Sequence, residues 1–150
     1  QGVDIITQHT DSTAPLQVAA ERGIKGFGQA SDMIKFAPET QLTSIVDDWG
    51  PYYIERVQAV MDGTWEQNDV WGGMKDGHVV MAPYTNMPDD VKAAAEEIEA
   101  KIKDEGFNPF TGPVYKQDGT LWLEEGQGAP DGEVLSMNFY IKGIDDKLPN

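Results

Sequence analysis

The sequence predicts an α/β domain built on a parallel sheet with helices on its faces. Short runs of apolar and β-branched residues alternate with segments of helical periodicity along most of the chain. The apolar runs end in polar clusters, as strands at a ligand-binding edge do. Apolar residues make up 39% of the 150 residues, which is enough to form one packed core.

The first segments predict a strand, a helix and a second strand. Val3–Gln8 is rich in β-branched residues and is typical of a strand. Ala14–Arg22 follows hydroxyl residues, has Pro15 in its first turn and ends at Gly23, which are helix signals. Ile24–Gly28 then predicts the second strand. Because a helix connects the two strands, we expect them to be parallel.

The next segments extend this pattern. Leu42–Val46 predicts a third parallel strand, and Pro51–Asp62 predicts a helix. Val79–Ala82 predicts a fourth strand. Apolar side chains of the helix share one face at helical spacing: Tyr53, Ile54, Val57, Val60 and Met61.

The clearest helix signal begins at Pro88. Asp89 and Asp90 complement the positive amino end of the helix dipole, and Lys101 and Lys103 complement its carboxyl end. Glutamates four residues before each lysine add favourable pairs. We expect one apolar stripe to be buried: Val91, Ala94, Ala95, Ile98 and Ile102.

The pattern changes after Gly106. Thr111–Lys116 and Thr120–Leu123 flank the turn Gln117–Gly119 and predict a C-terminal hairpin. Leu135–Ile141 predicts a final, returning strand.

Composition excludes several functional classes. Asp and Glu outnumber Lys and Arg by 26 to 11, for a net charge of −15. This balance argues against nucleic acid as a partner and against electrostatic binding to a membrane surface, because no Lys/Arg cluster is present. Cysteine is absent, which excludes disulfides, thiolate nucleophiles and cysteine-ligated metals. No apolar run reaches the roughly 18 residues of a membrane-spanning helix.

The start of the chain has no initiator Met and no signal peptide. Gln1–Ile6 is typical of the start of a strand. We therefore expect any targeting segment to lie outside these 150 residues.

Three polar clusters predict a ligand site. Gln8–Thr13, Gln29–Asp32 and Asp47–Trp49 follow the three parallel strands, whose carboxyl ends share one edge of the sheet. Tyr84–Asn86 is a fourth candidate after the strand at Val79. The alternative is that Ser12, Thr13 and Ser31 cap helices and turns and that the rest are solvated loops.

Other chemistry has weaker signals. His9, Asp11 and Ser12 are too close in sequence to align as base and nucleophile, so we expect no catalytic residue. His9 and His78 have no ligand partners at helical spacing, so we expect no metal. Gly26-Phe27-Gly28 lacks the third glycine of a dinucleotide fingerprint, so we expect no cofactor. Trp49 follows a strand end directly, where its ring could stack on a flat ligand. The alternative is that it packs under the following helix against Tyr53.

Longer stretches of the sequence resemble the C-terminal half of basic membrane protein (BMP) family substrate-binding proteins, which are extracytoplasmic receptors of ABC importers. The resemblance runs through essentially the whole chain. The stretches that carry it are residues 8–14 (QHTDSTA), 26–33 (GFGQASDM), 47–53 (DDWGPYY), 71–77 (WGGMKDG), 83–88 (PYTNMP) and 137–140 (MNFY).

The resemblance implies a type I periplasmic-binding fold with two doubly wound lobes and the ligand between them. Residues 1–150 would supply the second lobe and the segments that return to the first. In members of the family, the ligand contacts in this half come from three places. Their equivalents here are the turn at Thr10–Ser12, the loop Gln29–Asp32 and the position of a Lys after a Leu-Thr-Ser strand. Asp47 stands in place of that Lys here.

The expected function is therefore binding of a purine base or nucleoside for import, without catalysis. Asp47 and Trp49 favour a free base, because carboxylates accept hydrogen bonds from amino and ring N–H groups. The expected ligand-binding residues are Gln8, His9, Thr10, Asp11, Gln29, Asp32, Asp47 and Trp49.

Partners and alternatives complete the expectation. The partners would be the purine ligand, an ABC transporter permease and the N-terminal half of the same protein. The protein would be periplasmic or a cell-surface lipoprotein. One alternative is a nucleoside hydrolase-like enzyme that uses His9 and nearby Asp residues, although its acids are scattered. Another is a sugar receptor of the same fold, which the scarcity of arginine (Arg22 and Arg56 only) disfavours.

Overall fold

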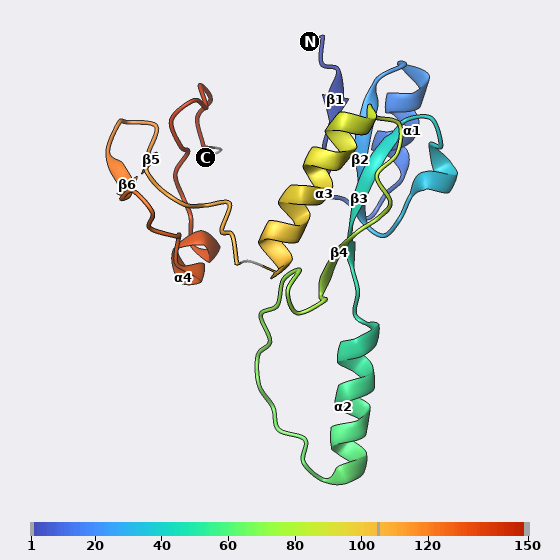
Figure 1. Ribbon diagram of the computed structural model, residues 1–150, viewed down its shortest axis with the longest axis vertical. Helices are drawn as coiled ribbons and strands as arrows, with labels where there is room; N and C mark the ends of the chain where they lie inside the picture. Colours follow the sequence, from blue (N-terminus) through green and yellow to red (C-terminus); the bar gives the residue numbers. More distant parts are fainter. Residues whose placement is uncertain (1, 105, 149–150) are drawn as a thin grey trace. The chain divides into compact units, whose positions relative to one another are not determined.

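The computed structural model describes residues 2–104 and 106–148 (Figure 1). The chain divides into two compact units, residues 1–104 and 105–150. The first holds a sheet with its helices, and the second holds a small hairpin with a short helix. No helix among the described residues is both long enough and apolar enough to cross a bilayer.

The first unit is built on a four-stranded sheet in the order β1-β2-β3-β4. The first three strands are parallel neighbours, as the sequence predicts, with Ile6 paired to Gly26 and Ala30 paired to Val46. The mixed α/β architecture with a parallel sheet is therefore confirmed. The strands are β1 (Ile5–Ile6), β2 (Lys25–Ala30), β3 (Gln41–Asp47) and β4 (Val79–Met81).

The direction of β4 differs from that of the other strands. It runs antiparallel to β3, with Asp47 paired to Val79. Its carboxyl end therefore lies at the opposite edge of the sheet. Asn86 shows this, because its Nδ2 donates to the carbonyls of Pro38 (2.8 Å) and Gln41 (2.7 Å) at the start of β3. The prediction that Tyr84–Asn86 joins the other strand-end clusters is wrong for this reason.

Three helices match their predicted positions closely: α1 (Ala14–Glu21), α2 (Gly50–Asp62) and α3 (Asp89–Asp104). A short 3-10 helix, η1 (Ile34–Phe36), was not predicted. Leu16 of α1 is completely buried and joins Met33 and Ala37 in the core. A Cβ at Gly26 would lie 2.8 Å from Leu16 Cδ2, so a glycine in β2 permits this close packing.

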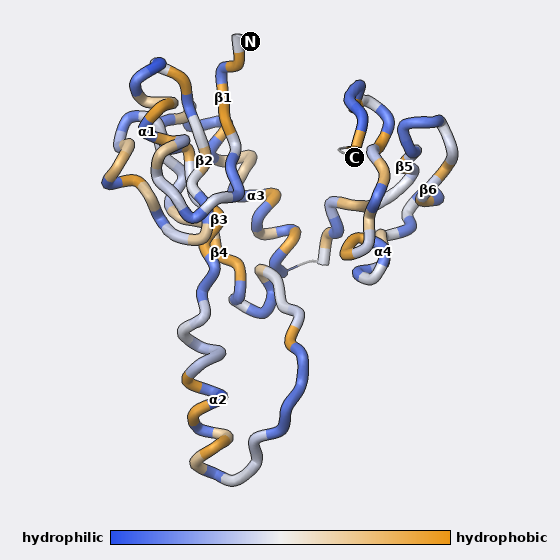
Figure 2. The backbone as a smooth tube through the Cα atoms, turned by 180° about the vertical axis from the view of Figure 1, so that it is seen from behind, coloured by the Kyte–Doolittle hydropathy of each residue, from blue (hydrophilic) through white to orange (hydrophobic). Residues whose placement is uncertain are grey.

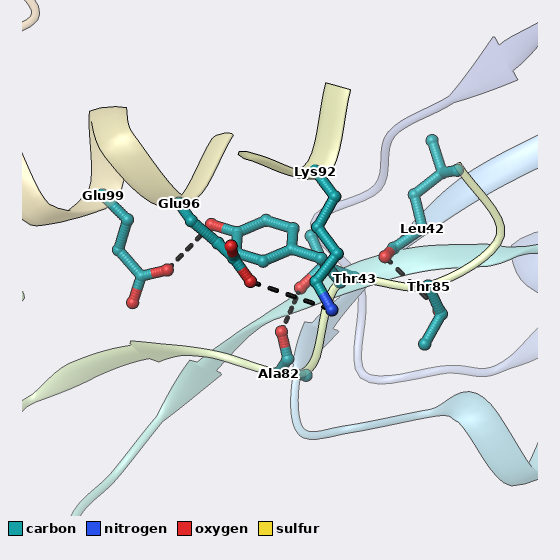
Figure 3. A network of polar contacts seen from close by, with 8 residues as sticks. Leu42, Thr43, Ala82, Thr85, Lys92, Glu96 and Glu99 are labelled. Carbon is teal, nitrogen blue, oxygen red and sulfur yellow. Dashed lines mark hydrogen bonds and ion pairs between the residues drawn. The ribbon is translucent and has the colours of Figure 1, made fainter. Parts of the chain in front are cut away.

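Helix α3 is tied to the sheet region by polar contacts (Figure 3). Tyr84 Oη donates to Glu99 Oε2 over 2.9 Å. Thr43 and Thr85 donate to carbonyls of neighbouring segments, which fixes the chain that leads from β4 to the helix. The predicted burial of the α3 stripe is wrong, since α3 has no buried residue. Periodicity identifies an apolar face but not the surface that covers it.

The second unit contains the predicted hairpin of β5 (Val114–Tyr115) and β6 (Leu121–Leu123), paired antiparallel. The predicted strand Leu135–Ile141 is wrong. Pro130 instead precedes the short helix α4 (Asp131–Leu135), and only Ile141 forms a bridge, to Lys116. The Pro130 backbone is extended, which suits a residue directly before a helix.

Candidate ligand-binding site

Three of the predicted clusters follow the parallel strands β1, β2 and β3. Because the strands are parallel, their carboxyl ends face one edge of the sheet, where open α/β sheets bind ligands. Gln8–Asp11 follows β1, residues 29–32 end and follow β2, and Asp47–Trp49 ends and follows β3. Contact of these residues with a ligand stays a prediction.

The first cluster is partly used by the fold. Gln8 Nε2 donates to the carbonyl of Phe27 (3.3 Å) and lies 3.6 Å from Met33 Sδ. Thr10 Oγ1 donates to Gln8 Oε1 over 3.1 Å. Gln8 thereby ties the chain after β1 to β2. His9 and Asp11 are exposed. Among the described residues, no side-chain hydrogen bond or ion pair is found for either of them.

The second cluster forms a tight turn around Asp32. Ala30 has a φ of 62°, a left-handed conformation that is unusual for a non-glycine residue, and Ser31 N–H donates to the Gln29 carbonyl (2.8 Å). This turn brings Asp32 back toward the start of β3. Asp32 Oδ1 then accepts from Ile34 N–H (3.0 Å) and Gln41 Nε2 (2.8 Å).

Asp32 is thereby linked to a buried polar pair. Gln41 Oε1 accepts from Ser44 Oγ over 3.0 Å, and both side chains are buried in β3. A Cβ at Gly28 would lie 1.8 Å from Ser44 Oγ, so β2 needs a glycine there. Asp32 Oδ1 satisfies the buried Gln41 amide, which gives this carboxylate a structural role whether or not it binds a ligand.

The third cluster lines a cavity of about 270 Å³. Asp47 and Trp49 contribute from the end of β3, and Val70, Trp71, Gly72, His78 and Val79 contribute from the chain that returns from α2 to β4. Trp49 and Trp71 are 48% and 67% exposed. The cavity thus combines one carboxylate with wide aromatic surfaces that remain open to a further partner.

An aromatic cluster holds Trp49. The rings of Trp49 and His78 are stacked with centroids 6.0 Å apart and planes 25° apart. Tyr52 presents an edge to both, at 5.6 Å and 6.0 Å. Offset and edge-to-face rings stabilise each other, so they orient the Trp49 indole.

The backbone around this cluster is closely packed. Asp48 N–H donates to the His78 carbonyl (2.9 Å), which keeps the exit of β3 beside the entry to β4. Asp48 Oδ1 accepts from Gly50 N–H (3.1 Å) at the start of α2. A Cβ at Gly72 would lie 2.1 Å from His78 Nδ1, so only glycine lets the returning chain cover the imidazole.

Sequence reasoning missed His78 and Gly72 as lining residues of this cavity. The missing signal was the antiparallel direction of β4, which places His78 opposite Asp48.

Ser12 Oγ accepts from Ala14 N–H (3.2 Å) at the start of α1, which is a turn and capping role. Within residues 2–104 and 106–148, no group of three or more His, Cys, Asp or Glu side chains could hold a metal ion.

Comparison with known proteins gives a consistent assignment. The family model described as "ABC transporter substrate-binding protein PnrA-like" matches residues 1–111. A purine-binding protein of Brucella abortus is 68% identical over 149 residues, which cover 99% of this chain and 43% of that protein. A putative ABC transporter glucose-binding protein of Haloferax volcanii is 24% identical over 151 residues, which cover 100% of this chain and 36% of that protein. The chain thus spans less than half the length of these relatives.

Solved structures agree on the fold. A transcriptional activator of the comK gene from Bacillus halodurans superposes with a TM-score of 0.63 at 20% identity, over 71% of this chain and 39% of that one. An ABC transporter solute-binding protein from Conexibacter woesei superposes with a TM-score of 0.53 at 16% identity, over 71% and 37%. At these identities the likeness concerns the fold alone.

Proposed function

Because this chain belongs to the family of PnrA-like substrate-binding proteins of ABC transporters, we propose that it contributes one lobe of a receptor that binds a purine base or nucleoside. The observation that carries this proposal is the 68% identity with a purine-binding protein over nearly the whole chain. Binding without turnover is the proposed activity, as expected of a receptor that delivers its ligand to a permease.

The cavity at the end of β3 supports a flat heterocyclic ligand. Trp49, Trp71 and His78 supply aromatic surface, and aromatic rings stack on planar ligands at little entropic cost. Asp47 supplies a carboxylate acceptor for amino and ring N–H groups, both of which adenine and guanine carry. Only a free base keeps the imidazole N–H that the sugar replaces in a nucleoside, so we favour a base over a nucleoside.

The proposed receptor needs a second polypeptide part. The chain covers 43% of the purine-binding relative, and the cavity's tryptophans are widely exposed. We propose that the N-terminal half of the longer protein supplies the opposite wall. Ligand binding would then favour a closed arrangement of the two lobes that an ABC transporter permease recognises. The receptor would lie outside the cytoplasm, either in the periplasm or at the cell surface as a lipoprotein.

The test uses a chimera in which this chain replaces the matched residues of the Brucella abortus purine-binding protein. Calorimetry would compare adenine, guanine, hypoxanthine, adenosine, inosine and glucose. We expect a purine base to bind with a Kd of about 1 μM or tighter and glucose to bind at least about 100-fold more weakly.

Other outcomes would reassign the function. Glucose binding without purine binding would favour the sugar receptor, in line with the Haloferax volcanii relative. Release of free base from inosine or adenosine, measured by chromatography, would indicate the hydrolase.

A further inference from the structure

Four Asp-Gly pairs occur in the chain, and this dipeptide can rearrange chemically without an enzyme. Glycine has no side chain, so its amide nitrogen approaches the preceding aspartate side chain with little hindrance. The rearrangement requires that this nitrogen and the carboxyl group are free to meet. All four aspartates are exposed, so exposure does not distinguish the pairs Asp62-Gly63, Asp76-Gly77, Asp118-Gly119 and Asp131-Gly132.

The glycine amide is tied in three of these pairs. Each of the three N–H groups donates to a backbone carbonyl three residues earlier: Gly63 to Val60 (3.2 Å), Gly77 to Met74 (3.1 Å) and Gly119 to Lys116 (2.9 Å). Gly132 differs. Among the described residues its N–H has no acceptor, because it lies in the first turn of α4, where a helix leaves its amides unpaired. Its nitrogen can therefore turn toward a side chain without first breaking a hydrogen bond.

The carboxyl groups divide in the same way. In the same three pairs the aspartate side chain accepts a hydrogen bond: Asp62 from Gln58 Nε2 (3.0 Å), Asp76 from Gly73 N–H (3.0 Å) and Asp118 from Thr120 N–H (2.9 Å). The bond from Thr120 also lowers the pKa of Asp118, which keeps that carboxyl group ionised and a poorer electrophile. Within residues 2–104 and 106–148, the Asp131 side chain has neither a hydrogen bond nor an ion pair.

The start of α4 is also weakly held. This helix has five residues, and none of them is buried. Hydrophilic residues predominate in the chain between β6 and α4, as Figure 2 shows. Helices of this length are marginal without tertiary packing, so we expect the first turn to open at a low cost in free energy. Opening gives the Asp131 carboxyl group and the Gly132 nitrogen the freedom to meet.

We propose that Asp131-Gly132 is the site at which this chain spontaneously forms isoaspartate. With the carboxyl group protonated, the Gly132 nitrogen attacks Asp131 Cγ. The N–Cγ bond forms, a C–O bond of the carboxyl group breaks, and the hydroxyl leaves with the amide proton as water, which closes a succinimide. Water then adds to the main-chain carbonyl carbon of Asp131 and breaks its bond to nitrogen, which takes up a proton. Water is the only co-reactant, the mass is unchanged, and no ligand takes part.

The rearrangement would alter the backbone at the first residue of α4, because the chain then continues through Cβ and Cγ. The N–H groups of Glu133 and Val134 both donate to the Pro130 carbonyl, at 3.0 Å and 3.1 Å, across this residue. We expect both bonds to be lost. Glu133 Oε2 also accepts from Trp122 Nε1 (2.7 Å), so the link between α4 and β6 would loosen as well. The site thus couples chemical ageing of the chain to the order of its second unit.

Peptide mapping of the chimera measures the four pairs in one sample. After incubation at 37 °C, digestion and mass spectrometry with electron-transfer fragmentation distinguish isoaspartate from aspartate at each pair. We expect isoaspartate to accumulate at Asp131 at least about tenfold faster than at each of the other three aspartates. In denaturant the four rates should agree within about threefold, because the hydrogen bonds that separate them are lost.

A variant of the glycine tests the attacking group. Gly132→Ala adds a methyl group that hinders the nitrogen and should slow isoaspartate formation at Asp131 by about tenfold. A Cβ at Gly132 meets nothing within 4 Å, so the fold should be retained. Gly73→Ala is the matched control. It also adds a methyl group in open space but follows no aspartate, so the rate at Asp131 should not change.

Hydrogen exchange tests the structural consequence. In the isoaspartate form, separated by chromatography, the Glu133 and Val134 amides should exchange faster than in the parent form. Three results would overturn the proposal. They are another Asp-Gly pair that reacts as fast as Asp131 in the folded chimera, a rate at Asp131 that Gly132→Ala leaves unchanged, and exchange at both amides that is equal in the two forms.

Discussion

Trp49 is the residue on which the ligand hypothesis depends most directly. If a purine stacks on its indole, binding should quench tryptophan emission in the chimera, and Trp49→Phe should remove most of that change. Trp122→Phe is the matched control, because Trp122 lies in the second unit, where it donates to Glu133 and contacts Phe139. Fluorescence titration measures both. Quenching that survives Trp49→Phe would assign the stacking to Trp71 or to the other lobe.

Asp32 and Asp47 should respond differently to substitution. Asp32→Ala leaves the buried Gln41 amide without its acceptor and should lower the free energy of unfolding by about 1–3 kcal/mol, as measured by denaturant titration. Asp32→Asn keeps an oxygen at that position and should restore most of the stability. Any purine affinity that Asp32→Asn loses in calorimetry would then report the loss of the charge and of the second acceptor oxygen, and not a loss of the fold.

Asp47 is exposed and lines the cavity without a comparable structural bond. Asp47→Asn should therefore leave unfolding nearly unchanged and cost about 1–3 kcal/mol of purine binding in the chimera. Unchanged purine affinity in this variant, with the fold intact, would remove Asp47 from the site.

At the scale of single residues, the sequence predicts which strand ends carry polar groups, because a strand and the loop after it are contiguous. It does not predict that His78 lies beside Trp49. That proximity depends on the pairing of β3 with β4, which joins residues about 30 positions apart and is decided by tertiary structure.

At the scale of secondary structure, local signals were sufficient for the helices. Pro15, Pro51 and Gly63 mark helix ends in the sequence, and the structure begins and ends α1 and α2 beside them. Leu135–Ile141 failed because its apolar residues alternate as in a strand, while the preceding Pro130 and Asp131 start a helix. The stripes of α2 and α3 could be read as apolar faces, but helical spacing does not predict which surface packs against such a face.

The link between Tyr84 and α3 can be tested as an element-level contact. Burial, and secondarily the hydrogen bond to Glu99, raise the pKa of Tyr84 above its usual value. Tyr84→Phe should lower the free energy of unfolding by about 1 kcal/mol near neutral pH, because it removes one bond to a carboxylate.

The pH dependence of that difference follows from the sign of the shift. An unfolded tyrosine ionises near pH 10, whereas the folded Tyr84 keeps its proton to higher pH. The stabilisation is therefore complete below about pH 10 and declines as the pH rises above it. Denaturant titrations from pH 7 to 11 should show the gap between the parent chain and Tyr84→Phe narrowing only at the alkaline end. A constant gap would contradict the raised pKa.

At the scale of the whole molecule, the chain carries one wall of the proposed site. Its cavity of about 270 Å³ lies just below the range of about 300–1,000 Å³ that is typical of ligand pockets, and Trp49 and Trp71 remain widely exposed around it. Burial from both sides is what gives a flat ligand most of its affinity.

This incompleteness predicts a difference between the chain and the chimera. A ligand that binds only the folded state raises its stability by RT ln(1 + [L]/Kd), or about 2.7 kcal/mol at a concentration of 100 Kd. Adenine should therefore raise the Tm of the chimera, while the 150-residue chain at the same adenine concentration should shift little, because one wall alone binds at least about tenfold more weakly. Glucose is the control ligand in both. An equal adenine shift in the two proteins would mean that the Asp47–Trp49 cavity is a complete site on its own and that the other lobe contributes nothing to ligand affinity.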